Sequence, residues 1–296
     1  MNLWRLRYTT RMTELKLAQL TDHFYWLAPG PPDRPTLGAV VGERGTLLLD
    51  AGASAVHARL FLDALAAANL PAPLYVALTH WHWDHVFGAE ALGLPVIAHA
   101  LTAQQLATLA TYAWDDAAMD ARVQTGEETA SSAENIKLEL PAPRSVRIIQ
   151  PTFTFTDSLK IDLGGVTCTL QHVGGEHATD SVVAYIEPDR VLFLGDCLYP
   201  VIYGAPTWQY TRQTVLPLLD KVSGFDAQHY LEGHGAGLIS QAEFARLTGQ
   251  MRLVADLVVA HGADEAAILA AAERAGQPRD EDLLDFVHAF IAGIPK

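Results

Sequence analysis

Cysteine and basic residues are scarce in this chain of 296 residues. Only Cys168 and Cys197 are present, which excludes a disulfide framework and a site built from four thiolates. This usage fits a reducing compartment, so we expect a cytoplasmic protein. Lys and Arg number 20 against 34 Asp and Glu, giving a formal net charge of −14. A broad nucleic-acid surface is therefore not expected, because Lys and Arg supply most of the affinity for phosphates.

Long apolar runs are also missing. No segment reaches the ~20 apolar residues that a membrane-spanning helix needs. Residues 1–11 mix Trp4 with Arg5, Arg7 and Arg11 and lack the continuous apolar stretch of a signal peptide. Because 50% of the residues are hydrophobic, the chain is expected to fold. We expect a soluble protein that acts on a small molecule, with no membrane or nucleic-acid partner; its oligomeric state is left open.

Short apolar and β-branched runs, separated by Gly and Pro turns, predict strands in both halves of the chain. They cover residues 24–28, 36–41, 46–50, 74–78, 96–98, 152–156, 159–163, 166–170, 182–186 and 191–194. Helical spacing and capping residues predict helices over 54–69, from Thr102 toward Arg122, from Ser240 onward, and over 265–275 and 281–292.

This organisation predicts an α+β protein with one main domain. Residues 1–20 are expected to be an N-terminal extension and residues 21–240 the main domain. A helical insertion over about 101–145 interrupts that domain, because this stretch is rich in Asp, Glu, Thr and Ser. Residues 241–296 are expected to form a helical segment packed on the same domain.

The segment from His80 to His85 carries three imidazoles and one carboxylate directly after a predicted buried strand. His80 and His82 are two residues apart, so in extended chain both project to one side and can bind one ion. Asp84 and His85 can face a neighbouring position. These ligands are too many for one catalytic ion, which needs about three protein ligands and an open position for water. They are too few for two ions.

Three further residues can complete two sites. Each follows a strand-like run and has glycine nearby, which allows a close approach of the backbone to a ligand. They are His177, Asp196 and His234. Imidazole and carboxylate donors suit zinc, iron or manganese. We expect two divalent ions, with zinc favoured and iron or manganese as alternatives.

These seven positions resemble the metallo-β-lactamase superfamily, whose pattern is His-x-His-x-Asp-His followed at long intervals by His, Asp and His. The resemblance runs from about Phe24 to His234. It implies a four-layered αββα sandwich with the metals at one edge of the two sheets. It also implies that a first metal is bound by His80, His82 and His177, that a second is bound by Asp84, His85 and His234, and that Asp196 bridges them.

The resemblance implies two supporting residues as well. Asp50 and Asp180 match family positions that orient ligand histidines, with helix capping or turn formation as the alternative role for each. Two other residues compete for ligand roles. Cys197 could replace Asp196, as in lactamases that use a thiolate, but neighbours on a strand point to opposite sides. His172 competes with His177 but lies within a strand run.

Two metals can activate a shared water as hydroxide at neutral pH, and this hydroxide is the expected nucleophile. In the family arrangement Asp84 orients it and moves its proton. Tyr199 and Tyr203 follow Asp196 and could donate to the developing oxyanion, or simply pack. We therefore predict a hydrolase of a small ester, lactone or thioester, similar to glyoxalase II and lactonases.

Several other activities stay open. The His177-Ala178-Thr179-Asp180 segment differs from glyoxalase II, which disfavours a glutathione thioester. No Lys follows Cys197 closely to bind the carboxylate of a β-lactam, which weakens the prediction of β-lactam hydrolysis. A mononuclear iron persulfide dioxygenase is disfavoured by the retention of Asp84, His85 and His234. A nuclease is disfavoured by the acidic composition.

Overall fold

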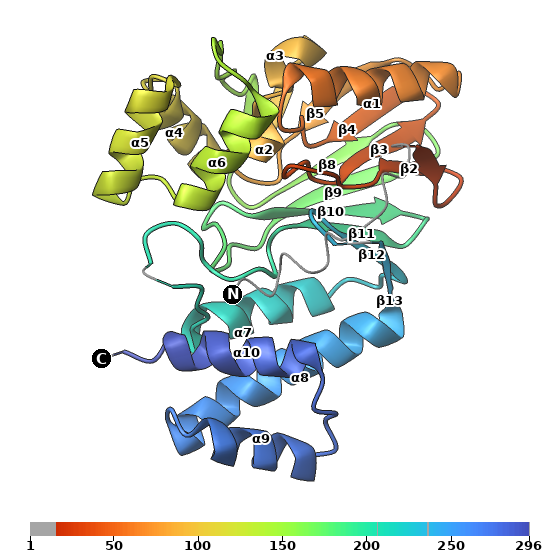
Figure 1. The fold of residues 1–296 in the computed structure, drawn as a ribbon. Coiled ribbons are helices and arrows are strands. Elements are labelled where there is room, and N and C mark those ends of the chain that lie inside the picture. Colours follow the sequence, from red (N-terminus) through yellow and green to blue (C-terminus); the bar gives the residue numbers. More distant parts are fainter. Residues whose placement is uncertain (1–15, 206, 236, 296) are drawn as a thin grey trace.

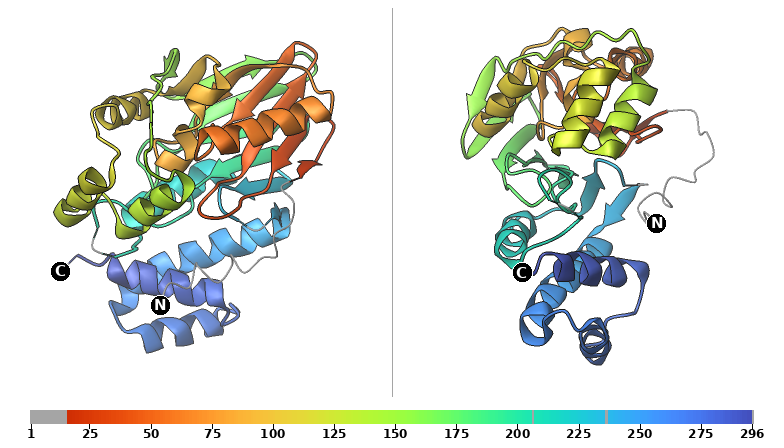
Figure 2. Two further views of the ribbon diagram at one scale, coloured as in Figure 1. Left: turned by 45° about the horizontal axis from the view of Figure 1, so that its top comes forward. Right: turned by 60° about the vertical axis from the view of Figure 1, so that its left-hand side comes forward.

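Two β-sheets lie face to face between two layers of helices (Figure 1). The computed structural model describes residues 16–205, 207–235 and 237–295. Figure 2 shows the same layering from two other sides. The predicted α+β fold, an αββα sandwich with inserted and C-terminal helices, is confirmed.

The first sheet has seven strands in chain order. Its first four strands are antiparallel and its last four are parallel, with β4 common to both parts. The strands are β1 (Leu17–Gln19), β2 (Phe24–Leu27), β3 (Leu37–Gly42), β4 (Gly45–Leu49), β5 (Pro73–Ala77), β6 (Val96–His99) and β7 (Phe153–Phe155).

The second sheet has six strands in the order β13-β12-β11-β10-β9-β8. Only β11 and β12 are parallel neighbours. The strands are β8 (Ser158–Asp162), β9 (Thr167–His172), β10 (Val182–Glu187), β11 (Val191–Gly195), β12 (His229–Glu232) and β13 (Leu238–Ser240).

Helices cover the outer faces of both sheets (Figure 1). On the first sheet lie α1 (Ala55–Ala67), α2 (Trp83–Val86) and α3 (Ala89–Leu92). On the second lie α7 (Arg212–Ser223), α8 (Gln241–His261) and α10 (Glu281–Ala292), and α9 (Glu265–Arg274) packs against α8 and α10 on their outer side. At one side stand the helices of the insertion, α4 (Ala100–Leu109), α5 (Asp116–Thr125) and α6 (Ala130–Glu139).

The central strands carry long apolar runs because both of their faces are buried. In β4, Leu47 and Leu49 face the core between the sheets, while Leu48 packs under the first helix layer. In β11, Phe193 faces the same central core and Leu192 packs against the C-terminal helices. Each such side chain contributes ~1.5–3 kcal/mol by burial. The strand ends are thereby fixed rigidly.

One predicted helix differs from the structure. A single helix opening at Thr102 and running toward Arg122 is wrong, because the chain leaves helical conformation between Leu109 and Asp116. The first helix begins at Ala100, where the His99 imidazole accepts a hydrogen bond from the Leu101 amide. Asp115 then caps a new helix by accepting from the Ala118 amide at 3.0 Å.

The predicted N-terminal extension and C-terminal helical segment both pack on the main domain where the structure describes them. Of the predicted extension over 1–20, residues 1–15 lie outside the described residues, while β1 pairs with β2 at the edge of the first sheet. Helices α8, α9 and α10 share one core with the second sheet. Within the described ranges, no helix is both long and apolar enough to cross a membrane.

Acid should destabilise the fold through His57, which lies fully buried in the first turn of α1. Burial, and then the charge of Arg34, lowers its pKa from 6.5 to about 3. Below pH 6.5 the unfolded chain therefore binds a proton at this imidazole that the folded chain does not bind. The free energy of unfolding then falls by up to about 1.4 kcal/mol for each unit by which the pH decreases. Urea unfolding should show that the free energy of unfolding falls less between about pH 7 and pH 5 for His57→Gln than for the parent. Equal slopes would contradict this account.

Candidate metal centre

The seven residues predicted as ligands come together at one edge of the two sheets. The segment from His80 to His85 follows β5, and His177 lies in the loop between β9 and β10. Asp196 and His234 follow β11 and β12, which are parallel and so end at the same edge. The ligand atoms form two groups, each within 4.8 Å: His80, His82 and His177, and Asp84, His85, Asp196 and His234.

Asp196 belongs to the second group and also faces the first. Its Oδ2 is 3.2 Å from His177 Nε2 and 3.9 Å from His80 Nε2 in the first group. The same oxygen is 3.3 Å from both His85 Nε2 and His234 Nε2 in the second. One carboxylate oxygen therefore faces four imidazoles that come from three separate segments of the chain.

The histidines are held by their outer nitrogens. His85 Nδ1 is 2.8 Å from Asp50 Oδ2, His80 Nδ1 is 3.0 Å from Thr79 Oγ1, and His177 Nδ1 is 3.2 Å from the Pro200 carbonyl. Such partners fix the tautomer and ring orientation of metal-binding histidines. The inner Nε2 atoms are left to face the middle of the cluster.

Those inner nitrogens fit a metal centre. The buried Nε2 atoms of His80, His82, His85 and His177 make no hydrogen bond of normal geometry to any described residue. A buried donor or acceptor left in this way costs about 1–3 kcal/mol, and coordination would remove that cost. The donors are imidazoles and carboxylates, which suit zinc, iron and manganese.

The pKa shifts of His80, His82 and Asp196 favour the forms that bind metals, whereas for His85, against the effect of burial, Asp84, Asp196 and Asp50 raise the pKa. Burial lowers the pKa of His80 well below its ordinary value, and the His85 imidazole acts in the same direction. Burial and the His177 imidazole do the same for the pKa of His82. Burial opposes ionisation of Asp196, but the imidazoles of His234 and His85 outweigh it and hold its pKa well below its usual range. Neutral imidazole and ionised carboxylate are the forms that bind metals.

Asp50 supports the cluster from beneath. It is fully buried and accepts hydrogen bonds from the Thr79 amide at 2.7 Å and the Thr79 hydroxyl at 2.9 Å, besides facing His85. Its φ of 63° lies in the left-handed region, which non-glycine residues occupy at a cost and mostly near functional sites. Asp50 thus makes the contact with a predicted ligand histidine that was expected of it.

Three further residues were considered from the sequence, namely Asp180 as a supporting residue and Cys197 and His172 as alternative ligands. Asp180 is fully buried, which raises its pKa to about 6, while nearby Thr102 and His177 lower it. Cys197 packs in the core between the second sheet and the C-terminal helices, where burial raises its pKa well above normal. His172 stacks on His99 with ring centroids 3.9 Å apart. Neither Cys197 nor His172 belongs to the two groups.

The two candidate tyrosines differ in their surroundings. Tyr199 accepts a hydrogen bond from the His234 amide at 3.2 Å, and its ring lies 5.8 Å from that of His177. Tyr203 donates its hydroxyl to Ser132 Oγ at 3.0 Å, and its ring lies 4.9 Å from that of His82. Tyr199 therefore has its hydroxyl near the second group, whereas the Tyr203 hydroxyl is directed to α6.

Sequence reasoning missed two residues at the site. Asp33 Oδ1 is 3.6 Å from His234 Nδ1, although its segment offered only turn signals. Gly233 lies against Asp196: a Cβ there would lie 1.9 Å from Asp196 Oδ1 and 3.2 Å from His85 Cε1. The glycine beside His234 was noted for close backbone approach, but the sequence could not identify the neighbour it makes room for.

A family model and a known relative both match parts of this chain. A model of the metallo-beta-lactamase superfamily matches residues 31–281. Over 68 residues, the chain is 32% identical to "Metallo-beta-lactamase type 2" of Bacteroides fragilis. That match covers 23% of this chain and 26% of the relative, so it spans about a quarter of the relative's length.

Solved structures share the fold at low identity. A metallo-beta-lactamase from Pontibacter korlensis has a TM-score of 0.55 and 18% identity, covering 78% of this chain and 96% of that one. A metallo-beta-lactamase family protein from Thermus thermophilus gives 0.57 and 20%, covering 87% and 95%. A sec-alkylsulfatase from a Pseudomonas species gives 0.64 and 14%, covering 90% and 45%. With the match over residues 31–281, the chain belongs to the metallo-beta-lactamase superfamily.

Proposed function

We propose that the chain is a hydrolase with two metal ions that cleaves a small ester, lactone or thioester. The observation that carries the proposal is the position of Asp196, whose one carboxylate oxygen faces imidazoles of both ligand groups at 3.2–3.9 Å. His80, His82 and His177 would bind the first ion, and Asp84, His85 and His234 the second, with Asp196 shared. Zinc is the expected metal, because nitrogen and oxygen donors in a site with an open position suit it.

When bound, two such ions supply an activated water and polarise the carbonyl that it attacks. Asp84 would orient this water. Burial opposes its ionisation, but the imidazoles of His85 and His234 hold its pKa well below the ordinary range. Its Oδ2 lies 3.0 Å from His234 Nε2 and 3.3 Å from His85 Nε2. An ionised carboxylate in this position can accept a hydrogen bond from the water and align it for attack.

Tyr199 would donate to the oxygen of the substrate carbonyl as charge develops there. Its hydroxyl oxygen accepts from the His234 amide, which holds the phenol beside the second ligand group, and a phenol can donate while it accepts. A preorganised donor of this kind contributes about 10²–10³-fold to rate. Tyr203 would contact the substrate beside His82, together with Trp81, whose ring centroid is 5.0 Å from that of Tyr203.

β-Lactam hydrolysis is the second candidate, favoured by the similarity to the Bacteroides fragilis protein. In this reaction the activated water would attack the carbonyl of a cyclic amide, and the same residues would take part. The segment after Asp196 continues with Cys197, Leu198 and Tyr199 and supplies no Lys for a substrate carboxylate. We therefore place it behind ester and lactone hydrolysis.

A substrate panel on metal-loaded protein tests the proposal. Lactones, esters, thioesters, β-lactams and phosphodiesters should be assayed with zinc-, iron- and manganese-loaded chain, with Asp84→Asn as the matched variant. We expect hydrolysis of a lactone, ester or thioester, which chelation removes and Asp84→Asn lowers strongly. One iron per chain with thiol-dependent oxygen uptake would contradict the proposal. Cleavage of phosphodiesters alone would contradict it as well.

A further inference from the structure

The loop between β2 and β3 is tied to the segment that carries His234. The Thr36 amide donates to the Gly233 carbonyl at 2.6 Å. Within the loop, Gly30 and Arg34 exchange two backbone hydrogen bonds of 2.9 and 2.7 Å, which closes a compact turn. Asp33 lies in this turn, with its Oδ1 3.6 Å from His234 Nδ1. The turn is therefore fixed against the second ligand group.

Each of three other cluster histidines has an outer partner for Nδ1, namely Asp50 for His85, Thr79 for His80 and the Pro200 carbonyl for His177. Asp33 occupies the corresponding place for His234, at an ion-pair distance of 3.6 Å and without a hydrogen bond of normal geometry. Its carboxylate favours a proton on Nδ1, which leaves Nε2 with the lone pair directed at Asp84 and Asp196.

Asp33 is itself held by the helical insertion. Its second oxygen, Oδ2, accepts a hydrogen bond from Asn135 Nδ2 of α6 at 3.0 Å. One turn further along α6, both carboxylate oxygens of Glu139 accept a hydrogen bond from Arg34 Nε at 3.0 Å. Glu139 also accepts a hydrogen bond from the Ser54 hydroxyl. Ser132, one turn earlier, meets Tyr203.

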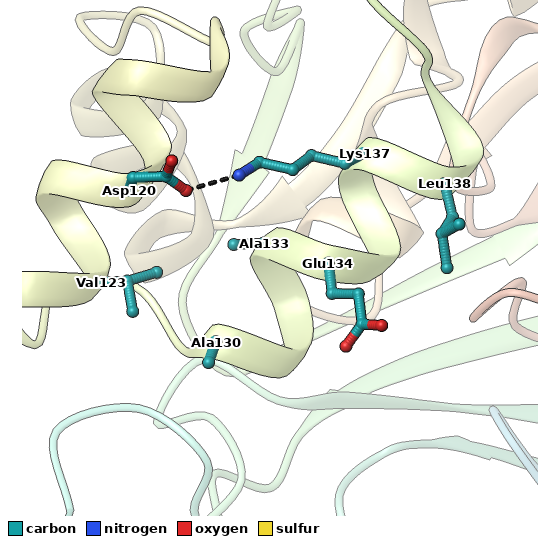
Figure 3. Close-up of a pocket in the computed structure, with 7 residues that line it drawn as sticks. All are labelled: Asp120, Val123, Ala130, Ala133, Glu134, Lys137 and Leu138. Atoms are coloured by element: carbon teal, nitrogen blue, oxygen red, sulfur yellow. Dashed lines mark hydrogen bonds and ion pairs between the residues drawn. The ribbon is translucent and has the colours of Figure 1, made fainter.

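These three residues of α6 lie on one face, since they are three and four positions apart. The opposite face carries Ala130, Lys137 and Leu138, which line an outer groove of about 350 Å³ between α5 and α6. There Lys137 reaches across to Asp120 of α5 (Figure 3). The helix therefore offers a matched control: one face bonds to the loops around the metal centre and the other does not.

We propose that Asp33 is a positioning residue for His234, held in place by Asn135, so that the helical insertion sets the affinity of the second metal site. This inference rests on the proposed function, because it assumes that His234 binds the second ion. Loss of a partner that orients a metal-binding histidine typically lowers metal affinity by about 10–100-fold.

Zinc binding tests the inference without any substrate. Competition with a chromophoric chelator should give the stepwise affinities of two zinc ions for the parent, Asp33→Asn, Asp33→Ala, Asn135→Ala and Lys137→Ala. We expect the Asp33 variants to bind the second ion roughly 10–100-fold more weakly, with the first ion unchanged. Asn135→Ala should shift the second affinity in the same direction by less, and Lys137→Ala should match the parent. Melting temperatures would identify any variant that fails to fold.

The outcomes separate the two proposals. If the parent binds fewer than two zinc ions, the proposed function fails and this inference with it. If the parent binds two and both Asp33 variants bind the second ion with parental affinity, only this inference is overturned. Asp33→Asn keeps the size of the side chain, so a loss in that variant reports on charge and not on a cavity.

Discussion

Replacing Asp196 by asparagine should lower hydrolysis by about 10³-fold or more, because the change affects both ligand groups at once. Removal of a single hydrogen-bond donor from an active site costs about 10²–10³-fold, and a shared metal ligand carries more of the site than one donor does. The side chain is buried and its Oδ2 faces four imidazoles. Steady-state kinetics and zinc content measured by mass spectrometry would test the prediction.

Asp162→Asn is the matched control. This carboxylate is 60% exposed and pairs with Arg44 at the surface, where an ion pair contributes little. It should retain parental turnover and zinc content. An Asp196→Asn variant that keeps two zinc ions and parental turnover would remove the bridging role.

Alanine at Gly233 should have an effect nearly as large, although Gly233 supplies no ligand. Its added Cβ would lie 1.9 Å from Asp196 Oδ1, closer than any real contact, so the carboxylate must move. Because a displacement of about 1 Å costs on the order of 10²-fold in a positioned site, we expect a loss of that size or greater in turnover. Zinc content should fall with it, while the circular dichroism spectrum stays that of the parent.

Gly249→Ala controls for a general effect of replacing glycine. Gly249 lies within α8, and a Cβ there would meet nothing within 4 Å. Alanine in a helix interior is favoured over glycine by up to about 1 kcal/mol. This variant should be active and slightly more stable. Parental activity and zinc content in Gly233→Ala would contradict the close packing of the backbone on Asp196.

The strands of the core could be predicted from sequence because their residues are apolar on both faces. Runs such as Leu47 to Leu49 and Val191 to Leu194 cannot be exposed on either side. The helix α7 was not predicted, and it contains Pro217, a residue that usually interrupts a helix. The start of α4 was misplaced because the capping-box spacing at Thr102 suited a helix start, whereas His99 caps the helix in the structure.

The ligand cluster could be foreseen for a chemical reason. His80, His82, Asp84 and His85 stand too close together in the chain to be explained by packing, and they required partners elsewhere. Asp50 was foreseen as a supporting residue, but two others were not. Asp33 and Asn135 are 102 positions apart, and neither lies in a recognisable motif. Only the fold of the insertion against the β2–β3 loop reveals that they meet.

Anomalous diffraction at the zinc edge, from crystals of zinc-loaded protein, tests the central claim most directly. The account predicts two peaks per chain, one bounded by His80, His82 and His177 and the other by Asp84, His85 and His234, with the Asp196 carboxylate between them. A single peak, or two peaks of which neither contacts Asp196, would contradict it.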